Sequence, residues 1–390
     1  MQSKKICSRI VVKVGSSLLG SRDNHINLKH LRGIVNQLNG LLAQDKQVVL
    51  VSSGAIACGM SLLKIKKRPK EIAALQATAA IGQNELMAMY RKLLKKQGRL
   101  CAQVLLTWDD FEDRRRYLNV RQTVLNLLEN KVLPVINEND TVDTDEIRFG
   151  DNDKLSALVA NLIAAELLII LSDVEGLYRL PEKKVIKVVD EITPEINRIC
   201  CNTDKQACVG GMSSKIEAVK IATGLGIPAV IASGKSPDAL LKAVFGEPVG
   251  TFFPAKGAGL KERKRWIAYG VRTKGTLTVD DGAKNALVKN GKSLLSVGIT
   301  GVKGNFAQNE TVSIVDRCQN EFARGKVNFS ARELEARKGL RHQPEGSACL
   351  PDRQGLASNS QSHQPEGSGL ASNSQSHKQE VVHRDNLVIL

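Results

Sequence analysis

The stretch Val11-Val12-Lys13-Val14-Gly15-Ser16-Ser17 decides the fold, because it joins a short buried strand to a turn of small residues. An apolar, β-branched run interrupted by one lysine predicts a strand, and Gly-Ser-Ser is typical of a turn. Gly15 lets backbone N–H groups approach an anion, and Lys13 adds a positive charge. The stretch therefore indicates a phosphate site, although a lysine beside a glycine turn is also typical of a solvated strand end.

The same arrangement of an apolar run followed by small or polar residues recurs along the chain. Helical patterns separate these runs, including 153–164 and 213–225 and a helix after the capping residue Asn27. Near-continuous apolar strands that alternate with helices predict an α/β fold, in which a mainly parallel sheet is covered on both faces and ligands bind beyond the carboxyl ends of the strands. The further strands and their polar ends are 47–51 before Ser52-Ser53-Gly54, 132–136 before Asn137-Glu138-Asn139-Asp140, 167–171 before Ser172-Asp173, and 228–232 before Ser233-Gly234.

Composition excludes several classes of protein. The 390 residues, 42% hydrophobic and 25% charged, are typical of a soluble globular protein with about two domains. No apolar run is long enough for a signal peptide or a membrane helix, and the eight cysteines form no CxxC pair, so we expect a cytoplasmic protein with reduced thiols and no membrane partner. The six histidines avoid the middle of the chain, which argues against a histidine metal site or a Ser-His-Asp triad there.

The composition changes near residue 256, which predicts a second domain. We expect a catalytic domain at 1–255, a basic linker at 256–273, a small, mainly β domain at 274–341 and a closing strand at 380–390. Residues 342–379 contain two copies of His-Gln-Pro-Glu-Gly-Ser and little apolar content, so we predict a disordered insertion. Residues 256–341 hold 18 Lys and Arg against 8 Asp and Glu, which fits either an acidic partner such as RNA or a solvated basic face.

Acidic and amide residues crowd two loops of the first domain, 137–146 and 150–154. Carboxylates this close repel one another unless cations neutralise them, and a substrate ammonium group or Mg²⁺ would do so. For single residues such as Asp151 or Asp153, a solvated loop or a helix cap explains the sequence equally well. The clustering at strand ends favours a functional site.

A second basic element, Gly210-Gly211-Met212-Ser213-Ser214-Lys215, precedes a predicted helix. Two glycines, two hydroxyl groups and a lysine at the amino end of a helix are suited to an anion, although such a loop is as often only a capped helix start. Together, Lys13 and Lys215 could bracket a phosphoryl group.

These motifs together resemble the ordered series of the glutamate 5-kinases, a group within the amino acid kinase family. The resemblance runs from about residue 8 to 255 and implies a three-layer αβα sandwich. The segment from about 274 resembles the PUA domain, a small β module of RNA-modifying enzymes, and His383-Arg384-Asp385 resembles its usual ending. The motifs are Lys13-Val-Gly-Ser-Ser17, Ser52-Ser-Gly-Ala-Ile-Ala57, Val135-Ile-Asn-Glu-Asn-Asp140, Gly150-Asp-Asn-Asp-Lys-Leu-Ser-Ala157, Ser172-Asp-Val-Glu-Gly-Leu-Tyr178 and Gly210-Gly-Met-Ser-Ser-Lys215.

The resemblance implies a role for individual residues. Lys13 and Lys215 would contact the ATP phosphates, with Asp153 beside them as a third catalytic residue. The remaining ATP contacts would come from Ser172, Asp173, Gly210, Gly211, Met212, Ser213 and Ser214, and the glutamate contacts from Ser53, Asp140, Asn152 and Asp151. Ser172 stands where threonine is usual, and Val209 where a threonine often opens the loop. The resemblance also implies Mg²⁺ carried by ATP with no direct protein ligand, inhibition by proline and a homo-oligomer, either a dimer or a tetramer.

The resulting hypothesis is transfer of the γ-phosphoryl group of ATP to the side-chain carboxylate of L-glutamate, which gives L-glutamyl 5-phosphate in the first step of proline biosynthesis. A carboxylate is ionised at pH 7, so this reaction needs no general base. The alternatives are an amino acid kinase that uses aspartate, N-acetylglutamate, carbamate or UMP, and an RNA-binding protein led by the basic second domain. A second domain misfolded by the repeats is a third.

Overall fold

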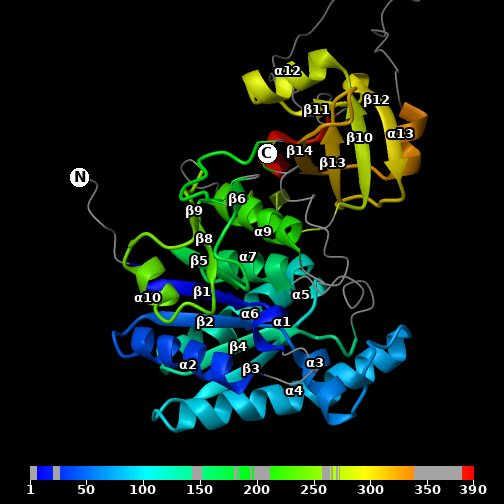
Figure 1. Cartoon of the computed structure of the whole chain (residues 1–390). Helices are drawn as coiled ribbons and strands as arrows, with labels where there is room; N and C mark the ends of the chain where they lie inside the picture. The colour runs from blue at the N-terminus through cyan, green and yellow to red at the C-terminus, as the bar shows by residue number, and fades with distance from the viewer. Residues whose placement is uncertain are drawn as a thin grey trace, which may run out of the picture. The chain divides into compact units, whose positions relative to one another are not determined.

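A computed structural model shows two compact units, Met1–Leu260 and Lys261–Leu390. Each unit is described by itself, with the element labels of Figure 1. In the described parts of the chain, no helix combines the length and the apolar character that a membrane span requires. The described residues are 7–20, 27–142, 152–179, 182, 184–193, 196, 211–256, 264, 267–268, 271, 273–337 and 380–390.

The first unit is built on a seven-stranded sheet with the order β3-β4-β2-β1-β5-β8-β9. All neighbouring pairs are parallel except β8 and β9, which are antiparallel. The polar ends of the parallel strands therefore meet at one edge of the sheet. The strands are β1 (Arg9–Val14), β2 (Gln47–Ser52), β3 (Cys101–Leu106), β4 (Leu133–Glu138), β5 (Leu167–Ser172), β8 (Ala229–Ser233) and β9 (Thr251–Phe253), and a hairpin of β6 (Tyr178–Arg179) and β7 (Lys184–Val185) lies outside the sheet.

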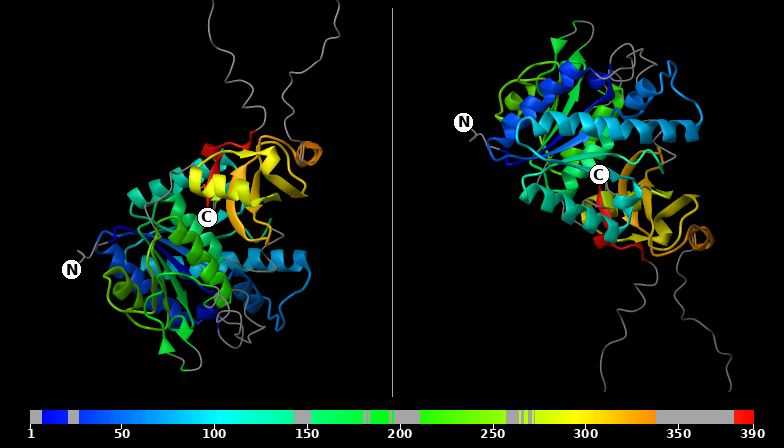
Figure 2. Two further views of the ribbon diagram at one scale, coloured as in Figure 1. Left: turned by 90° about the horizontal axis from the view of Figure 1, so that it is seen from above. Right: turned by 90° about the horizontal axis from the view of Figure 1, so that it is seen from below.

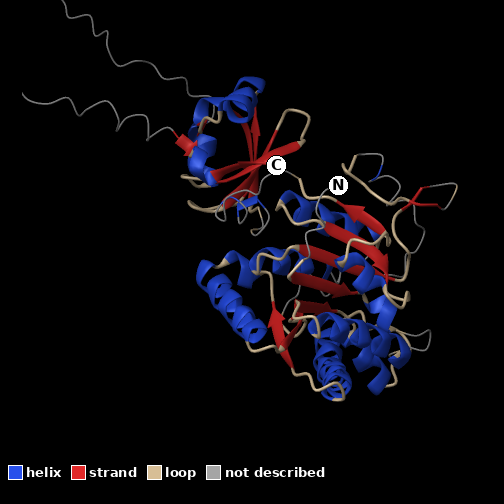
Figure 3. Ribbon diagram, turned by 90° about the vertical axis from the view of Figure 1, so that its left-hand side faces the viewer, coloured by secondary structure: helices blue, strands red, loops and turns tan. Residues whose placement is uncertain are grey.

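Helices cover both faces of this sheet, as Figure 3 shows. The predicted α/β class with a mainly parallel sheet is thereby confirmed. One face carries α2 (Leu28–Leu42), α4 (Ile72–Lys95) and α10 (Ala239–Val244), and α4 is the long helix in front in the right-hand view of Figure 2. The other face carries α6 (Arg114–Glu129), α7 (Asn152–Leu162) and α9 (Met212–Gly224), and the shorter helices are α1 (Ser16–Leu19), α3 (Ala55–Leu62) and α5 (Asp109–Glu112).

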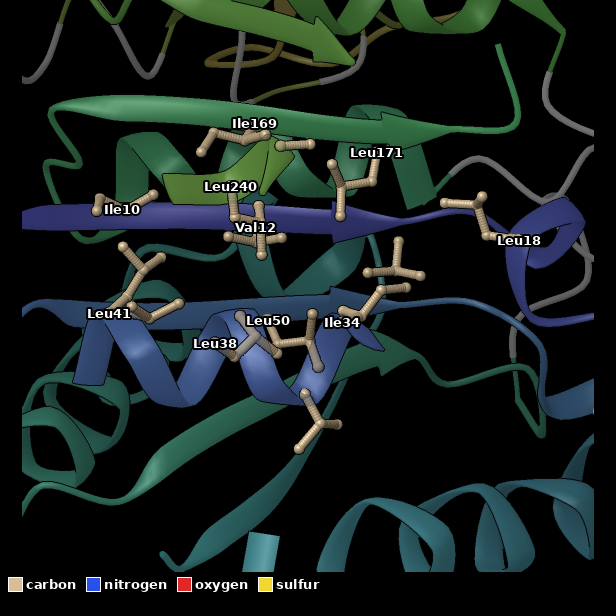
Figure 4. Packing of buried hydrophobic residues seen from close by; sticks show 14 of the residues in the cluster. Ile10, Val12, Leu18, Ile34, Leu38, Leu41, Leu50, Ile169, Leu171 and Leu240 are labelled. Atoms are coloured by element: carbon tan, nitrogen blue, oxygen red, sulfur yellow. The ribbon is translucent and has the colours of Figure 1, made fainter. Parts of the chain in front are cut away.

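Side-chain alternation in the strands explains why Lys13 faces α7. Ile10, Val12 and Val14 of β1 belong to the hydrophobic cluster under α2 and α4, and Figure 4 shows Ile10 and Val12 gathered there with Leu38 of α2. Since successive strand residues point to opposite faces, Lys13 points to the other one. Asn27 caps α2 as predicted, because its Oδ1 accepts a hydrogen bond from the His30 backbone N–H at 3.1 Å.

Two glycines let α3 and α4 approach each other closely. A Cβ atom added at Gly59 would lie 1.9 Å from the Thr78 carbonyl oxygen, and one added at Gly82 would lie 1.8 Å from the Ala55 carbonyl oxygen. The turn before α3 contains a third glycine, Gly54, whose φ of 111° is in the left-handed region that glycine adopts readily. This packing holds α3, and the turn that precedes it, against α4.

The second unit contains a five-stranded sheet with the order β12-β10-β13-β14-β16 and a two-stranded sheet of β11 and β15. Its mainly β character is as predicted. Since β15 and β16 pair with β11 and β14, the residues after position 379 belong to the same unit as those before 338. The predicted disorder of 342–379 lies outside the described residues. The elements are β10 (Gly275–Val279), α12 (Asp281–Asn290), β11 (Leu294–Leu295), η2 (Ser296–Gly298), β12 (Ile299–Gly304), β13 (Thr311–Val315), β14 (Glu321–Lys326), α13 (Ala331–Arg337), β15 (Glu380–Val382), η4 (Arg384–Asn386) and β16 (Leu387–Ile389).

Candidate active site

Polar side chains collect at the carboxyl edge of the large sheet. Lys13 of β1 pairs with Val51 of β2 on one side and with Ile170 of β5 on the other, so the ends of these strands are neighbours. Ser53 and Asp173 follow β2 and β5 directly. Because the strands are parallel, these residues and the start of α7 share one end of the sheet.

Asp153, in the first turn of α7, holds both predicted lysines. Its Oδ1 lies 2.6 Å from the Lys13 Nζ, and its Oδ2 lies 3.2 Å from the Lys215 Nζ. Ser214 donates a hydrogen bond from its hydroxyl to the same Oδ2 at 2.7 Å. The structure therefore brings β1, α7 and α9 together through one carboxylate.

This cluster is almost completely withdrawn from solvent. The exposed fraction is 4% for Lys13, 6% for Lys215 and 1% for Asp153. A solvated strand end at Lys13 and a solvated loop at Asp153, two of the alternatives that the sequence left open, are therefore wrong. Asp153 is not the helix cap either, because α7 begins at Asn152. The two ammonium groups and the one carboxylate carry a net charge of +1, which suits the approach of a polyanion.

The electrostatics of Asp153 result from two opposed effects. Burial raises the pKa of its carboxyl group, but the charges of Lys13 and Lys215, with hydrogen bonds from Lys13 and Ser214, outweigh burial and hold the pKa below its ordinary value. Asp153 is therefore a carboxylate at neutral pH, and it cannot serve as an acid. Its contacts suit it to orient the two lysines.

Two serine hydroxyl groups and one carboxylate form a cluster beside the turn that follows β1. Ser172, buried at the end of β5, donates to the Asp173 Oδ1 at 3.2 Å, and Ser17 donates to the same oxygen at 3.4 Å. Ser17 belongs to α1, which follows the Gly15 turn. The predicted nucleotide residues Ser172 and Asp173 thus lie next to the turn after β1.

A hydrogen bond joins two of the residues that are predicted to bind the substrate glutamate, Ser53 and Asn152. Asn152 donates from its Nδ2 to the Ser53 Oγ at 3.0 Å and to the Asn137 Oδ1 at 2.9 Å. Asn137 in turn donates to the Gln83 Oε1 of α4 at 2.8 Å. All four side chains are buried or nearly so. They form a continuous amide cluster that joins α4, the ends of β2 and β4 and the start of α7.

Asp140 is half-buried after β4, and its negative charge interacts with the Arg68 guanidinium. Burial lowers the pKa of Arg68, and the charge of Asp140 opposes that shift. Around the start of α9, Gly211 and Ser213 are exposed and Met212 is half-buried. The predicted site residues Asp151 and Gly210 lie outside the described residues.

Sequence reasoning missed the contacts of Gln83 and Arg68. Asn137 was among the acidic and amide residues that the sequence grouped at strand ends, but it was given no role of its own. Gln83 lies on α4 between the buried residues Gly82 and Leu86. In the sequence, its signal was a polar glutamine among small and apolar residues at helical spacing. Arg68 lies in the basic stretch before α4, which looks like any solvated loop.

Comparison with known proteins decides the family. The model of the amino acid kinase family matches residues 8–233, and that of the PUA domain matches residues 275–343. The chain belongs to the amino acid kinase family. The resemblance inferred from the motif series is thereby confirmed.

Several curated proteins that are similar to this chain are named glutamate 5-kinase. The protein of Thermoanaerobacter sp. (strain X514) is 42% identical over 98% of both chains, and so is that of Nitrosospira multiformis. The protein of Moorella thermoacetica is 40% identical over 98% of this chain and 96% of its own. The similarity therefore covers both units.

Proposed function

We propose that this amino acid kinase is a glutamate 5-kinase, which transfers the γ-phosphoryl group of ATP to the side-chain carboxylate of L-glutamate in the first step of proline biosynthesis. The observation that carries the proposal is the single buried carboxylate of Asp153 between the Lys13 and Lys215 ammonium groups. Full-length similarity to glutamate 5-kinases supports the choice of substrate.

The chemistry requires charge neutralisation more than proton transfer. An oxygen of the glutamate side-chain carboxylate attacks the γ-phosphorus, the bond from that phosphorus to the oxygen bridging to the β-phosphate breaks, and ADP leaves. The acceptor is already ionised, so no base is needed, but an anion must approach a polyanion. Lys13 and Lys215 would stabilise charge on the transferring group, and Asp153 would keep both ammonium groups in place.

On the acceptor side, Ser53, Asn152, Asp140 and Asp151 would bind glutamate. The hydrogen bonds that join Ser53, Asn152 and Asn137 support this assignment, because they order polar groups beside the lysine cluster. The carboxylate of Asp140 is suited to a substrate ammonium group.

On the nucleotide side, Ser172, Asp173 and residues 210–215 would hold ATP. The α9 amino terminus supports this, since the backbone N–H groups in the first turn of a helix and the helix dipole favour phosphate. Mg²⁺ would enter bound to ATP phosphate oxygens, its preferred type of ligand, and would offset their negative charge.

We propose that proline is a feedback inhibitor of this protein. We also propose that the chain forms a homo-oligomer, either a dimer or a tetramer, and that it works in the cytoplasm, where ATP and glutamate are available. The match of residues 275–343 to the PUA domain favours RNA as a partner of the second unit. Steeply salt-dependent binding of structured RNA would support that role. Binding that persists unchanged at high salt would count against it.

A substrate panel tests the proposed activity. Release of ADP is measured with MgATP and, one at a time, L-glutamate, L-aspartate, N-acetylglutamate, carbamate and UMP. We expect glutamate to give by far the largest kcat/KM. A larger value for any other acceptor would replace the assignment with another activity of the amino acid kinase family.

A further inference from the structure

The amide cluster beside the lysines has a fixed polarity. The Glu138 backbone N–H donates to the Asn137 Oδ1 at 2.9 Å, and a backbone N–H can only donate. The Asn137 Oδ1 is therefore an acceptor, and its Nδ2 must point the other way, where it donates to the Gln83 Oε1 at 2.8 Å. A flip of the Asn137 amide would break both hydrogen bonds.

This polarity determines which atom Asn152 offers to a ligand. Its Nδ2 spends both hydrogens, one on the Asn137 Oδ1 and one on the Ser53 Oγ. Its Oδ1 is buried and accepts no hydrogen bond within the part of the chain that the structure describes. A buried acceptor without a donor is costly, so this oxygen is suited to a donor on the substrate.

Gln83 is the member of the cluster farthest from the lysines along its hydrogen bonds. It lies on α4, is 8% exposed, and its Nε2 donates to the Gln103 Oε1 of β3 at 3.3 Å. With its Nε2 on Gln103, its Oε1 is turned to Asn137. Gln83 therefore supplies the acceptor that holds the Asn137 amide in the orientation set by Glu138.

We propose that Gln83 is a positioning residue for substrate specificity: it fixes the Asn137 and Asn152 amides so that the Asn152 Oδ1 faces the α-ammonium group of the amino acid. This inference rests on the proposed function. Gln83 itself does not touch the substrate. It acts through Asn137, and its effect is on the choice of a substrate that carries an amino group.

The test compares L-glutamate with glutarate, which has the same acceptor carboxylate but no amino group. Replacing Gln83 by methionine keeps the side-chain length and removes both hydrogen bonds. We expect Gln83→Met to raise the KM for glutamate about tenfold and to lower the glutamate-to-glutarate ratio of kcat/KM about tenfold, with the KM for ATP unchanged. In Gln83→Glu the donor to the Gln103 Oε1 is lost, and the Gln103 amide must turn so that its Nε2 donates to the new carboxylate. The other carboxyl oxygen can still accept from the Asn137 Nδ2, so this variant should keep a ratio near that of the wild type.

Gln37 offers a matched control. It is a buried glutamine of α2 that accepts from the Leu240 N–H at 3.0 Å and donates to the Ser236 carbonyl at 3.3 Å, outside the amide cluster. Gln37→Met should lower the melting temperature and leave the glutamate-to-glutarate ratio as in the wild type.

The outcomes separate this inference from the proposed function. If the wild type releases no ADP with glutamate, the proposed function fails. If the wild type is active and Gln83→Met keeps the wild-type ratio, or Gln37→Met lowers it equally, the positioning role is wrong. Should Gln83→Met not fold, Gln83→Glu decides, since loss of the ratio in that variant contradicts the proposal.

Discussion

Lys13 lies 2.6 Å from Asp153 in an ion pair that is almost fully buried and that joins β1 to α7. Lys215 takes the second oxygen of the same carboxylate. Three segments far apart in the sequence thus come together at one carboxylate, and the function that we propose depends on this arrangement.

Asp153→Asn is predicted to impair catalysis and stability, because it removes the negative charge at this position. The amide fills the same volume, but the two lysines lose their common anchor, so kcat should fall by about 10²- to 10³-fold. Buried ammonium groups without a counter-charge should also cost about 3–5 kcal/mol of unfolding free energy. MgATP should recover part of that loss, because its phosphates supply negative charge. Turnover assays and urea unfolding with and without MgATP measure both effects.

The neighbouring pair of Lys154 and Glu217 provides the control for that experiment. It also joins α7 to α9, with a 2.7 Å separation, but its side chains are 35% and 53% exposed. Lys154→Ala should therefore change the unfolding free energy by less than about 1 kcal/mol and keep most of the turnover. Near-normal turnover of Asp153→Asn would exclude the organising role of Asp153.

Substitutions of Asp140 and of Asp173 are predicted to raise the KM for different substrates. Asp140→Ala should raise the KM for glutamate about tenfold or more and leave that for ATP nearly unchanged. Asp173→Ala should do the reverse, because Asp173 lies with Ser17 and Ser172 beside the turn after β1. Initial-rate kinetics with each substrate varied in turn distinguish the two sites. Equal changes in both KM values for either variant would contradict the separation.

Gly82→Ala is predicted to be strongly destabilising. The new Cβ would lie 1.8 Å from the Ala55 carbonyl oxygen, so α3 and α4 would have to separate. We expect a loss of more than about 2 kcal/mol of unfolding free energy, measured by urea denaturation. Gly33→Ala on α2 is the control, because a Cβ there meets nothing within 4 Å and should stabilise by about 0.5–1 kcal/mol. Similar effects of both substitutions would disprove the close helix contact.

The turn between β13 and β14 is predicted to weaken in acid. A hydrogen bond from Lys284 and one from the Asn320 backbone lower the pKa of Asp316 from 3.8 to about 2. Since the folded-state pKa is the lower one, the stabilisation is complete above about pH 4 and is lost as pH falls toward 2. Hydrogen exchange at the amides of Cys318 and Asn320, which donate to Asp316, should show protection declining over that range. The same decline in Asp316→Asn would assign it to another group.

The sequence was sufficient to predict five strands of the sheet and the polar residues at their ends, but not β3 or β9. The apolar run that contains Lys13 ends in a glycine turn, and each later predicted strand also ends in small or polar residues, so one edge could be inferred from alternation of strands and helices alone. Likewise, Lys215 at a helix start indicated an anion site.

The particular partners could not be predicted, because they depend on three-dimensional placement. Several acidic residues surround Asp153 in the sequence, and only the geometry of the first turn of α7 shows which carboxylate faces the lysines. Gln83 lies more than fifty positions before its partner Asn137 on a helix of ordinary composition, and the approach of α4 to the end of β4 brings them together.

The most direct test of the central claim is to trap the product of the wild-type protein with hydroxylamine, which converts an acyl phosphate to a hydroxamate. With MgATP and L-glutamate, glutamyl hydroxamate should form in step with ADP, and Lys13→Ala and Lys215→Ala should each reduce it by orders of magnitude. ADP release without hydroxamate, or normal hydroxamate formation by either lysine variant, would contradict phosphoryl transfer between these two lysines.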